Sequence, residues 1–293
     1  MTTKKTPHIP IMVNEIIDIL DIQPHDVVLD GTIGFGGHAT QILPLLTQGH
    51  YIGIDQDEDA ITYCKTLFSN QNVTLIQDNY ANAKEHLKAN PKLTPTKILL
   101  DLGFSSYQLD SSGRGFSFLK DEPLDMRLST QTETTAAEVL NTYAKTDLSD
   151  LFYHHGDLIH NKKLVENIVR HRPVHTTDQL QTLIKKSYVF RNRSQLMKTC
   201  SQVFQALRIV VNNEMTHLTQ FLESLPQLLK PDARIAILTF HSGEDRLVKQ
   251  FVNQHPQLKK INNKVIVANQ DEIKKNSRAK PAKLRGIVYL NSV

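Results

Sequence analysis

The stretch Asp30–Ala39, DGTIGFGGHA, follows the apolar run VVL directly and combines one acidic side chain with four glycines. Glycines at this density between a strand-like and a helix-like segment are typical of a loop whose backbone approaches a ligand. Gly34, Gly36 and Ala39 fit the pattern G-x-G-x-x-A of dinucleotide-binding loops. Asp55 follows about 20 residues later, where a ribose-binding carboxylate is expected. A nicotinamide-dependent oxidoreductase is therefore one interpretation.

A second pattern overlaps the first. Asp30, Thr32, Gly34 and Gly36 resemble the D-x-G-x-G-x-G loop of S-adenosylmethionine-dependent methyltransferases, with threonine at the first glycine position. A carboxylate at the end of the first strand can accept hydrogen bonds from the loop or from a ligand ammonium group, which a methionine moiety carries and a nicotinamide dinucleotide lacks. Asp30 therefore favours the methyltransferase interpretation. Asp55 is expected to accept hydrogen bonds from the ribose hydroxyls in either case.

The elements that position these residues follow from the hydrophobic pattern. Strands are predicted at residues 27–30, 51–55, 73–77, 97–102 and 233–240, with a late pair at 264–268 and 285–290. Helices are predicted at residues 37–46, 58–70 and, less regularly, 80–89. This alternation is typical of βαβ units with a mostly parallel sheet, an α/β fold. Ligands of such sheets bind beyond the carboxyl ends of the strands.

About 130 residues separate the fourth predicted strand from the fifth, far more than a simple crossover needs. Helical patterns such as 135–143 and 161–172 fill much of this interval, and one long helix is predicted at 203–229. The predicted organisation is a core formed by residues 1–106 and 200–293. An inserted helical domain is predicted at 107–199.

The formal net charge of +4 is unevenly distributed along the 293 residues. Residues 1–155 hold 11 Lys and Arg against 20 Asp and Glu, whereas residues 156–208 hold 10 against 3 and residues 241–293 hold 11 against 4. Two basic blocks suit a partner with a phosphate backbone, because each neutralised phosphate releases counterions. Solvated helix faces are the alternative explanation.

No apolar stretch approaches the roughly 20 residues of a membrane helix, and the N-terminus lacks the apolar core of a secretory signal. We therefore expect a cytoplasmic protein without a membrane partner. Cys64 and Cys200 are the only cysteines. They are too few for a disulfide framework or a zinc site, so we expect no bound metal and two buried, structural thiols.

Longer motifs occur along the rest of the chain. They are DLGFSSYQLD (101–110), RGFSF (114–118), PLDMRL (123–128), FQALRIVVNNE (204–214), FHSGEDR (240–246) and NSRAKPAKLR (276–285). Together with GFGGH (34–38) they closely resemble, in the same order, the bacterial ribosomal RNA small-subunit methyltransferase H family. The resemblance implies a Rossmann-like class I fold and S-adenosyl-L-methionine as cofactor. It also implies methylation of N4 of a decoding-centre cytidine in small-subunit (16S) ribosomal RNA, presented either as naked RNA or within the 30S subunit.

The resemblance further implies a set of cofactor-binding residues. They are Gly34, Gly36, Gly37, His38, Asp55, Tyr80, Asp101 and Gln108. Tyr80 offers an aromatic face to adenine, Asp101 ends a predicted buried strand, and Gln108 can both donate and accept. A core tyrosine, a helix-capping aspartate and a surface glutamine are the structural alternatives, and the family usually has phenylalanine at the position of Tyr80.

The methyl transfer implied by the resemblance requires the two reactants to be oriented and does not require a covalent intermediate with the enzyme. The exocyclic amine of cytosine is a poor nucleophile because its lone pair is delocalised, whereas a sulfonium is an activated donor. We expect the enzyme to hold N4 in line with the S–CH3 bond and to accept hydrogen bonds from the amine. Ser105, in the turn Gly103-Phe104-Ser105-Ser106, and His241 are the candidate catalytic residues, with a structural histidine as the alternative at position 241.

Three arginines in the motifs could bind RNA phosphate, but structural ion pairs are the favoured interpretation. The expected pairs are Arg114 with Asp110, Arg127 with Asp125, and Arg246 with Asp245. The tripeptide TCS (199–201) resembles the nucleophile motif of RNA cytosine-C5 methyltransferases. There the cysteine follows the fifth strand, whereas Cys200 precedes it, so cysteine-based C5 chemistry is excluded.

The chain departs from the family pattern at residues 198–203, where KTCSQV replaces His-Pro-Ala-Thr-Arg-Thr, and at Gly243, where leucine is usual. If the replaced element touches RNA, the nearby Arg191, Arg193 and Lys198 could compensate for it. These departures affect the expected substrate surface and leave the cofactor motifs intact. A non-catalytic assembly factor that binds ribosomal RNA is therefore a further hypothesis.

Overall fold

A computed structural model of the chain describes residues 10–69, 71–88, 93–103, 105–110 and 112–290. These residues belong to two compact units, one formed by 1–103 together with 215–293 and the other by 104–214. Each unit encloses its own hydrophobic core.

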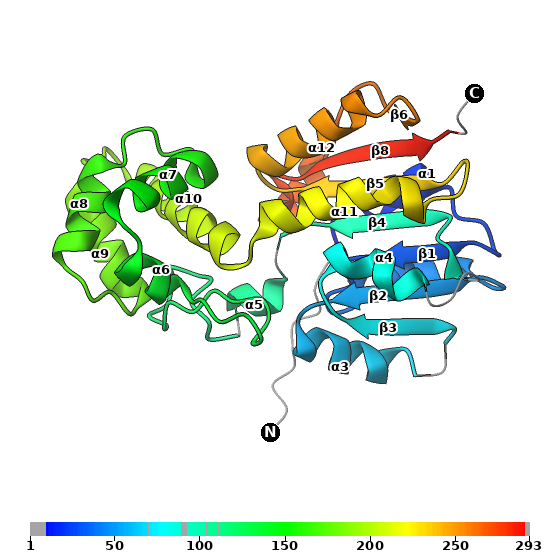
Figure 1. Cartoon of the computed structure of the whole chain (residues 1–293), viewed down its shortest axis with the longest axis horizontal. Coiled ribbons are helices and arrows are strands. Elements are labelled where there is room, and N and C mark those ends of the chain that lie inside the picture. Colours follow the sequence, from blue (N-terminus) through cyan, green and yellow to red (C-terminus); the bar gives the residue numbers. More distant parts are fainter. Residues whose placement is uncertain (1–9, 70, 89–92, 104, 111, 291–293) are drawn as a thin grey trace. The chain divides into compact units, whose positions relative to one another are not determined.

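Within the described residues, the first unit is built on one sheet of eight strands (Figure 1). The strands are β1 (Val27–Asp30), β2 (His50–Asp55), β3 (Val73–Gln77), β4 (Lys97–Asp101), β5 (Arg234–Thr239), β6 (Leu258–Lys260), β7 (Ile266–Val267) and β8 (Lys283–Tyr289). Their order is β3-β2-β1-β4-β5-β8-β6, with β7 also paired to β8. Neighbours among β1 to β5 are parallel, and β8 is antiparallel to its partners. The predicted Rossmann-like α/β sheet is confirmed; β6 was not predicted.

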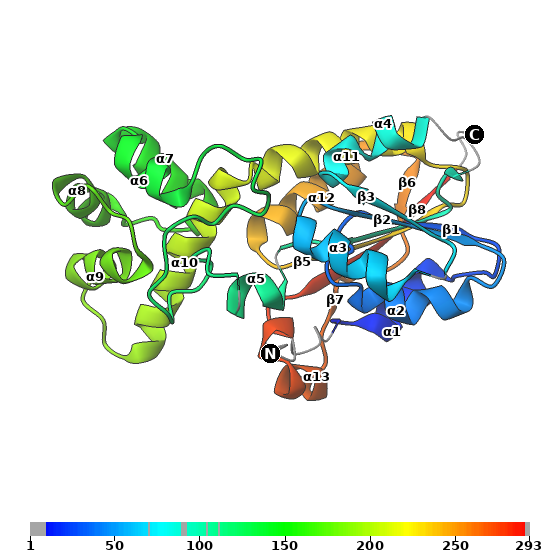
Figure 2. The ribbon, with the colours of Figure 1, turned by 90° about the horizontal axis from the view of Figure 1, so that it is seen from below.

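Helices cover both faces of this sheet. They are α1 (Val13–Leu20), α2 (Gly37–Ile42), α3 (Glu58–Leu67), α4 (Ala83–Lys88), α11 (Glu214–Leu228), α12 (Ser242–Gln254) and α13 (Gln270–Lys275), with 3-10 turns η1 (Leu43–Leu45), η2 (Tyr80–Asn82) and η4 (Ser277–Ala279). Figure 2 shows α4, α11 and α12 over one face and α1 and α2 over the other. Because both faces are covered, β4 buries Ile98, Leu99 and Leu100 in succession.

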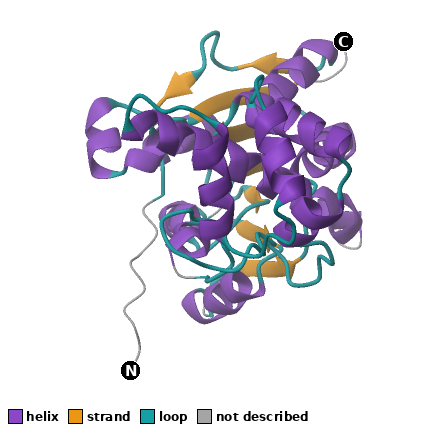
Figure 3. Ribbon diagram, turned by 90° about the vertical axis from the view of Figure 1, so that its left-hand side faces the viewer, coloured by secondary structure: helices purple, strands orange, loops and turns teal. Residues whose placement is uncertain are grey.

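The second unit is helical, and helices (purple in Figure 3) provide all of its named elements among the described residues. They are α5 (Ser106–Asp110), α6 (Ala136–Thr142), α7 (Lys145–Gly156), α8 (Lys162–Arg170), α9 (Thr177–Ser187) and α10 (Arg193–Val211). Capping boxes begin α6, through Thr135 and Glu138, and α9, through Thr176 and Gln179. The predicted helical insertion is therefore present.

The prediction of one long helix at 203–229 is wrong, because two helices, α10 and α11, cover this range. Asn213 adopts the left-handed backbone conformation, with φ 50°, between the two helices. The side chain of Asn212 is buried and its Oδ1 accepts a hydrogen bond from the Leu128 N–H at 2.7 Å. Asparagine tolerates the left-handed region better than most residues and bonds readily to nearby backbone. The pair of asparagines therefore ends α10.

The division between the two units also differs from the predicted one. The boundary predicted between residues 199 and 200 falls inside α10, and the first boundary lies after residue 103 instead of 106. Phe204 and Leu207 of α10 pack into the same core as Phe152 of α7. Residues 200–214 therefore belong to the helical unit and not to the sheet.

Candidate active site

Three carboxylates end neighbouring parallel strands of the first unit. Asp30, Asp55 and Asp101 are the last residues of β1, β2 and β4. The register places Asp30 beside Gly53 of β2 and beside Leu99 of β4, so the three strands finish at one edge of the sheet. This edge is where ligands of open α/β sheets bind.

Asp55 holds the glycine loop that follows β1. Its Oδ2 accepts a hydrogen bond from the Gly34 N–H at 2.8 Å, and its Oδ1 accepts one from the Asp57 N–H at 2.9 Å. Gly34 and Gly36 have φ of 51° and 77°, conformations that side chains rarely adopt. Burial raises the pKa of Asp55 to about 7, and the two backbone hydrogen bonds act in the opposite direction.

Two glycines of the loop are required by their surroundings. A Cβ at Gly36 would lie 2.8 Å from the ring of Phe68, and one at Gly31 would lie 2.5 Å from Leu100. Both distances are shorter than real side chains show. The predicted close approach of the loop backbone therefore has a steric basis within the first unit.

Both carboxylate oxygens of Asp30 accept hydrogen bonds from other residues of the protein. The Tyr51 hydroxyl donates to Oδ2 at 2.6 Å, and the Thr32 N–H donates to Oδ1 at 3.0 Å. Asp30 is buried, and this burial raises its pKa to about 6. Tyr51 was not among the predicted site residues, although a hydroxyl at the start of an otherwise apolar predicted strand is a signal for such a contact. Asp30 thus braces the start of the loop.

Asp101 carries an unused acceptor. Its N–H donates to the Thr32 Oγ1 at 2.7 Å, and its Oδ2 lies 3.5 Å from the Nδ1 of His38. The Nε2 of His38 lies 3.0 Å from the Ile11 carbonyl oxygen, which fixes the proton on Nε2, and burial lowers the pKa of this histidine. Asp101 Oδ1 is buried and has no hydrogen-bond partner in the part of the chain that the structure describes. A buried acceptor of this kind is suited to a ligand donor.

We expect the burial of Asp101 to make the thermal stability of the ligand-free protein depend on pH. Burial raises the pKa of Asp101 to about 7, above its unfolded value, so its contribution to stability is complete below about pH 4 and is lost as the pH rises through about 7. Asp101→Asn stays neutral, so its melting temperature at pH 8 should exceed that of the unchanged protein by at least about 2 °C. At pH 4.5 the two should be nearly equal.

Asp245→Asn is the matched control for this pH series. Burial alone would raise the pKa of Asp245, but its hydrogen bond and ion pair with Arg285 outweigh burial and lower the pKa. Asp245 therefore stabilises the fold at neutral pH, and Asp245→Asn should melt lower at pH 8. Thermal unfolding followed by circular dichroism measures both variants. Equal melting temperatures of Asp101→Asn and the unchanged protein at pH 8 would contradict the buried-carboxyl explanation.

Tyr80 begins the turn after β3 and is half-buried. Its ring makes an edge-to-face contact with Phe221 of α11, with centroids 5.5 Å apart. Its Cβ also lies near Gly31, so a side chain at that glycine would collide with it. Tyr80 therefore has a packing role on one side, and its predicted contact with adenine stays a prediction.

Ser105 and Gln108 lie in the second unit, at the start of α5. Gln108 Oε1 accepts from the Ser105 N–H at 2.8 Å, and Ser105 Oγ accepts from the Gln108 N–H at 3.2 Å. Gln108 is buried, so the alternative of a surface glutamine is wrong. Phe104 of the same predicted turn lies outside the described residues. The roles of Ser105 in catalysis and Gln108 in cofactor binding stay predictions.

His241 caps helix α12. Its Nδ1 accepts the Glu244 N–H at 3.4 Å, and Glu244 Oε2 accepts the N–H of His241 at 3.2 Å and of Phe240 at 2.8 Å. The Nε2 of His241 lies 3.2 Å from the same carboxylate, at Oε1. This reciprocal arrangement is a capping box with histidine in the first position. The geometry gives His241 a structural role, whereas its catalytic role stays a prediction.

Two substitutions at His241 separate capping from catalysis. His241→Ala should lower the free energy of unfolding by about 1 kcal/mol, because it removes the cap. His241→Asn restores a good capping oxygen without an imidazole, so it should recover most of the stability and most of the rate of the methyl transfer that the resemblance implies. Denaturant unfolding and the kinetics of that reaction measure the two effects. Full stability with lost activity in His241→Asn would assign the imidazole to catalysis instead.

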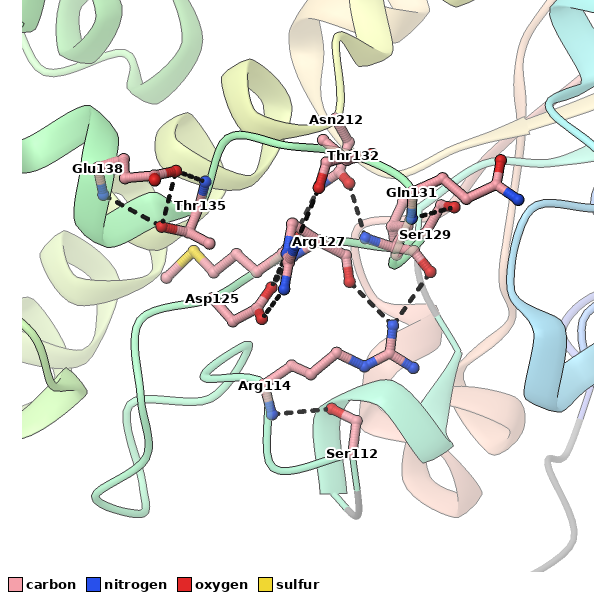
Figure 4. Close-up of polar contacts among 12 residues, drawn as sticks. Ser112, Arg114, Asp125, Arg127, Ser129, Gln131, Thr132, Thr135, Glu138 and Asn212 are labelled. Atoms are coloured by element: carbon pink, nitrogen blue, oxygen red, sulfur yellow. Dashed lines mark hydrogen bonds and ion pairs between the residues drawn. The ribbon is translucent and has the colours of Figure 1, made fainter.

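Two of the three arginines considered in the sequence, Arg114 and Arg127, are engaged in structural contacts. Arg127 forms a two-pronged pair with Asp125, at 2.8 Å from both carboxylate oxygens, as predicted (Figure 4). Arg114 Nη1 donates to the carbonyl oxygens of Arg127, at 2.9 Å, and Leu128, at 3.1 Å. These contacts tie the segment around Arg114 to the loop before α6.

The predicted pair of Arg246 with Asp245 is wrong. Asp245 Oδ1 accepts from the Nε of Arg285 at 2.8 Å, and its Oδ2 lies 3.3 Å from Lys283. Both basic partners lie on β8, a strand of the sheet, whereas Arg246 is an exposed residue of α12. Sequence proximity suggested a neighbour, but the antiparallel strand brings its own cations closer.

Both cysteines are buried, as expected. Cys64 lies 3.3 Å from the Gly34 carbonyl oxygen, and burial raises its pKa to about 12. Cys200 is buried in the core of the helical unit, and burial raises its pKa to about 11. A thiol that stays protonated is a poor nucleophile, so neither residue suits cysteine-based chemistry.

The sequence matches known proteins over nearly its whole length. A sequence profile of the MraW methylase family matches residues 5–289. The chain belongs to the MraW methylase family. The expected methyltransferase is thereby confirmed, with S-adenosylmethionine as its methyl donor, and the oxidoreductase hypothesis is excluded. Among the residues that the structure describes, no helix is long and apolar enough to cross a membrane.

Three curated relatives of this MraW methylase carry the name ribosomal RNA small subunit methyltransferase H. The protein from Dictyoglomus turgidum is 40% identical over 287 residues, which covers 95% of this chain and 96% of the relative. The one from Cyanothece sp. is 39% identical, with 95% and 93% covered. The one from Phocaeicola vulgatus is 37% identical, with 96% and 97% covered.

Proposed function

We propose that the protein transfers the methyl group of S-adenosylmethionine to N4 of a decoding-centre cytidine in small-subunit ribosomal RNA. The observation that carries this proposal is the glycine loop braced by Asp30 and Asp55 at the carboxyl edge of the sheet, in a chain of the MraW methylase family. The names of the three relatives supply the substrate class.

The residues at this edge fit the cofactor. Bound S-adenosylmethionine supplies an activated methyl group on a positively charged sulfur. Asp55 keeps unused lone pairs on both oxygens, so it can accept from ribose hydroxyls while it holds the loop. Asp101 Oδ1 is a buried acceptor that no described residue satisfies, and it offers a place for a ligand N–H. The remaining proposed contacts are the backbone of Gly34, Gly36 and Gly37 and the side chains of His38, Tyr80 and Gln108.

The proposed reaction does not require a strong general acid or general base from the protein. N4 of the cytidine has to face the methyl group with its lone pair, and acceptors that bind the amine hydrogens achieve this. Ser105 is retained as a proposed contact, because its hydroxyl accepts the Gln108 N–H and still has a proton to donate and a second lone pair. The proton of the amine can leave after the transfer.

The target base has to be unstacked before it can react. Binding of the RNA backbone by basic surfaces offsets the cost of moving a base out of folded RNA. We propose that the helical unit, residues 104–214, provides such a surface. The proposed partner in the cell is small-subunit ribosomal RNA, either free or within the 30S subunit. Because bacterial ribosomes are cytoplasmic, we propose that the protein acts in the cytoplasm.

Comparison of ribosomal RNA from cells with and without the protein tests this function. Nuclease digestion and mass spectrometry of small-subunit RNA should detect N4-methylcytidine at one decoding-centre position, and deletion of the gene should remove it. Restoration by the unchanged protein, but not by Asp55→Asn, links the modification to the site. An identical modification map in both cell types would instead support a non-catalytic assembly factor.

A further inference from the structure

A stretch of the helical unit is positively charged and lacks acidic residues. Residues 179–213 contain six Lys and Arg and no Asp or Glu. Five of these cations are exposed: Lys185, Lys186, Arg191, Arg193 and Lys198. They lie on the end of α9, the connecting segment and the first half of α10, and we call them the α9–α10 basic surface. Figure 2 shows this connecting segment at an edge of the unit opposite α7.

The cations of this surface are not used to hold the fold together. The sixth cation of the stretch, Arg208, is buried and forms a 2.8 Å ion pair with Glu214. By contrast, within the described ranges none of the five exposed cations forms an ion pair with a carboxylate. Lys185 donates to the neutral side chain of Gln181. Their charge is therefore available to an external anion.

Helix stability explains only part of the pattern. Lys185 and Lys186 lie in the last turn of α9, where cations favourably face the negative end of the helix dipole. Arg193, however, is the first residue of α10, and Arg191 comes just before it. Cations at a helix N-terminus are unfavourable by about 0.3–1 kcal/mol. These two arginines work against the stability of α10, so the fold alone does not account for them.

A cavity of about 310 Å³ lies within the same surface. Its basic lining residues are Lys120, Lys185 and Arg193, which converge from three separate segments. Two acids also line it, and each has a structural reason to be there. Asp178 lies in the favourable first turn of α9, and Asp121 accepts the N–H of Asp178 at 3.2 Å.

Apolar side chains are exposed among these cations. Val189, in the segment between α9 and α10, is 95% exposed, and Leu119 at the cavity is 69% exposed. Val189 contributes almost no buried area to the fold, and most of Leu119 is exposed to solvent. Apolar groups interleaved with Lys and Arg can pack against the sugars and bases of irregular RNA while the cations bind its phosphates.

We propose, building on the function proposed above, that the α9–α10 basic surface binds the sugar-phosphate backbone of the ribosomal RNA substrate. Arg191 and Arg193 each contact a phosphate, and the cavity beside Arg193 receives part of a nucleotide. Binding of this kind releases condensed counterions, so its affinity falls steeply with salt. The surface positions the RNA without reading its sequence.

Charge reversal at Arg191 and Arg193 tests this surface. The double variant Arg191→Glu/Arg193→Glu should bind a small-subunit RNA transcript at least tenfold more weakly at about 100 mM salt, and the slope of log affinity against log salt should shrink by about 1.5. Its melting temperature should be unchanged or higher, because acidic residues suit a helix N-terminus. Its affinity for S-adenosylmethionine should be unchanged. Fluorescence anisotropy, thermal unfolding and calorimetry measure the three quantities.

Lys162→Glu/Lys163→Glu is the matched control. These exposed lysines also begin a helix, α8, and their reversal changes the net charge by the same amount, but Glu166 lies one turn away. This control should bind RNA within about twofold of the unchanged protein. Equal losses in both variants, or no loss in the arginine variant, would overturn the proposed surface. Failure of the unchanged protein to methylate small-subunit ribosomal RNA, either free or within the 30S subunit, would instead overturn the proposed function.

Discussion

Asp55→Asn is expected to weaken S-adenosylmethionine binding by about 30- to 150-fold, which corresponds to about 2–3 kcal/mol. The two carboxylate oxygens accept the N–H groups of Gly34 and Asp57. Asparagine has one acceptor oxygen and one NH2 group, so it can keep only one of these hydrogen bonds, and its NH2 group faces the other N–H. The variant therefore weakens the anchor of the loop and removes one of the two oxygens proposed to accept from the ribose. Isothermal titration calorimetry with S-adenosylmethionine measures the change.

Asp57→Asn is the control for this loss. Asp57 is also acidic and lies two residues away, but its Oδ1 caps α3 through the Asp59 N–H at 3.2 Å. Asparagine is an equally good cap, so the control should bind the cofactor within about twofold of the unchanged protein. Comparable losses in both variants would mean that general electrostatics, and not the placement of Asp55, governs binding.

Gly36→Ala is the second substitution with a large expected effect, a loss of cofactor binding by at least tenfold together with lower stability. Its Cβ would meet the buried ring of Phe68 at 2.8 Å, and the φ of 77° is strained for alanine by about 1–2 kcal/mol. Because the ring cannot move freely in the core, the loop has to shift instead. Calorimetry and thermal unfolding follow the two consequences.

Two further variants isolate the clash from the backbone strain. Gly113→Ala imposes a similar strain at φ 67°, but nothing lies within 4 Å of its Cβ, so cofactor binding should be unaffected. Gly36→Ala/Phe68→Leu shortens the obstructing ring and should recover part of the lost affinity. If the double variant binds no better than Gly36→Ala alone, steric contact with Phe68 is not the reason for the glycine.

The sheet and its carboxyl edge could be predicted from sequence because the signals there are local. Each of the strands β1, β2, β3 and β4 is a short apolar run, and their parallel order follows from the helical segments between them. Asp30, Asp55 and Asp101 end three of these runs, so their common edge followed from chain direction alone. The glycine loop was recognisable because its spacing is set by backbone conformation.

Other features depended on contacts between residues far apart in the chain. Tyr51 bonds to Asp30 only because β1 and β2 are adjacent, and Arg285 reaches Asp245 across 40 residues. The break after α10 required Asn212 to bond to a backbone group 84 residues earlier. The apolar stripe continues through this break, so hydrophobic periodicity predicted one helix. Local patterns carry no information on such partners.

Structural roles at predicted site residues show a second limit of sequence reasoning. His241 stands in a motif beside the sheet, yet both of its nitrogens face Glu244 at the start of α12. Asp30 was expected to be able to serve either the loop or a ligand, and its oxygens serve the loop and Tyr51. In both cases the residue type suits chemistry, and only the positions of its partners reveal the structural use.

Methyl transfer in a purified system is the decisive test of the proposed function. Small ribosomal subunits from cells that lack the protein are incubated with it and with S-adenosylmethionine carrying a labelled methyl group, and the RNA nucleosides are then separated and identified. We expect label in N4-methylcytidine from the decoding centre, and much less label with Asp55→Asn at the same subsaturating cofactor concentration. Label on another atom or another nucleoside, or cofactor binding without any labelled RNA, would contradict the proposed function.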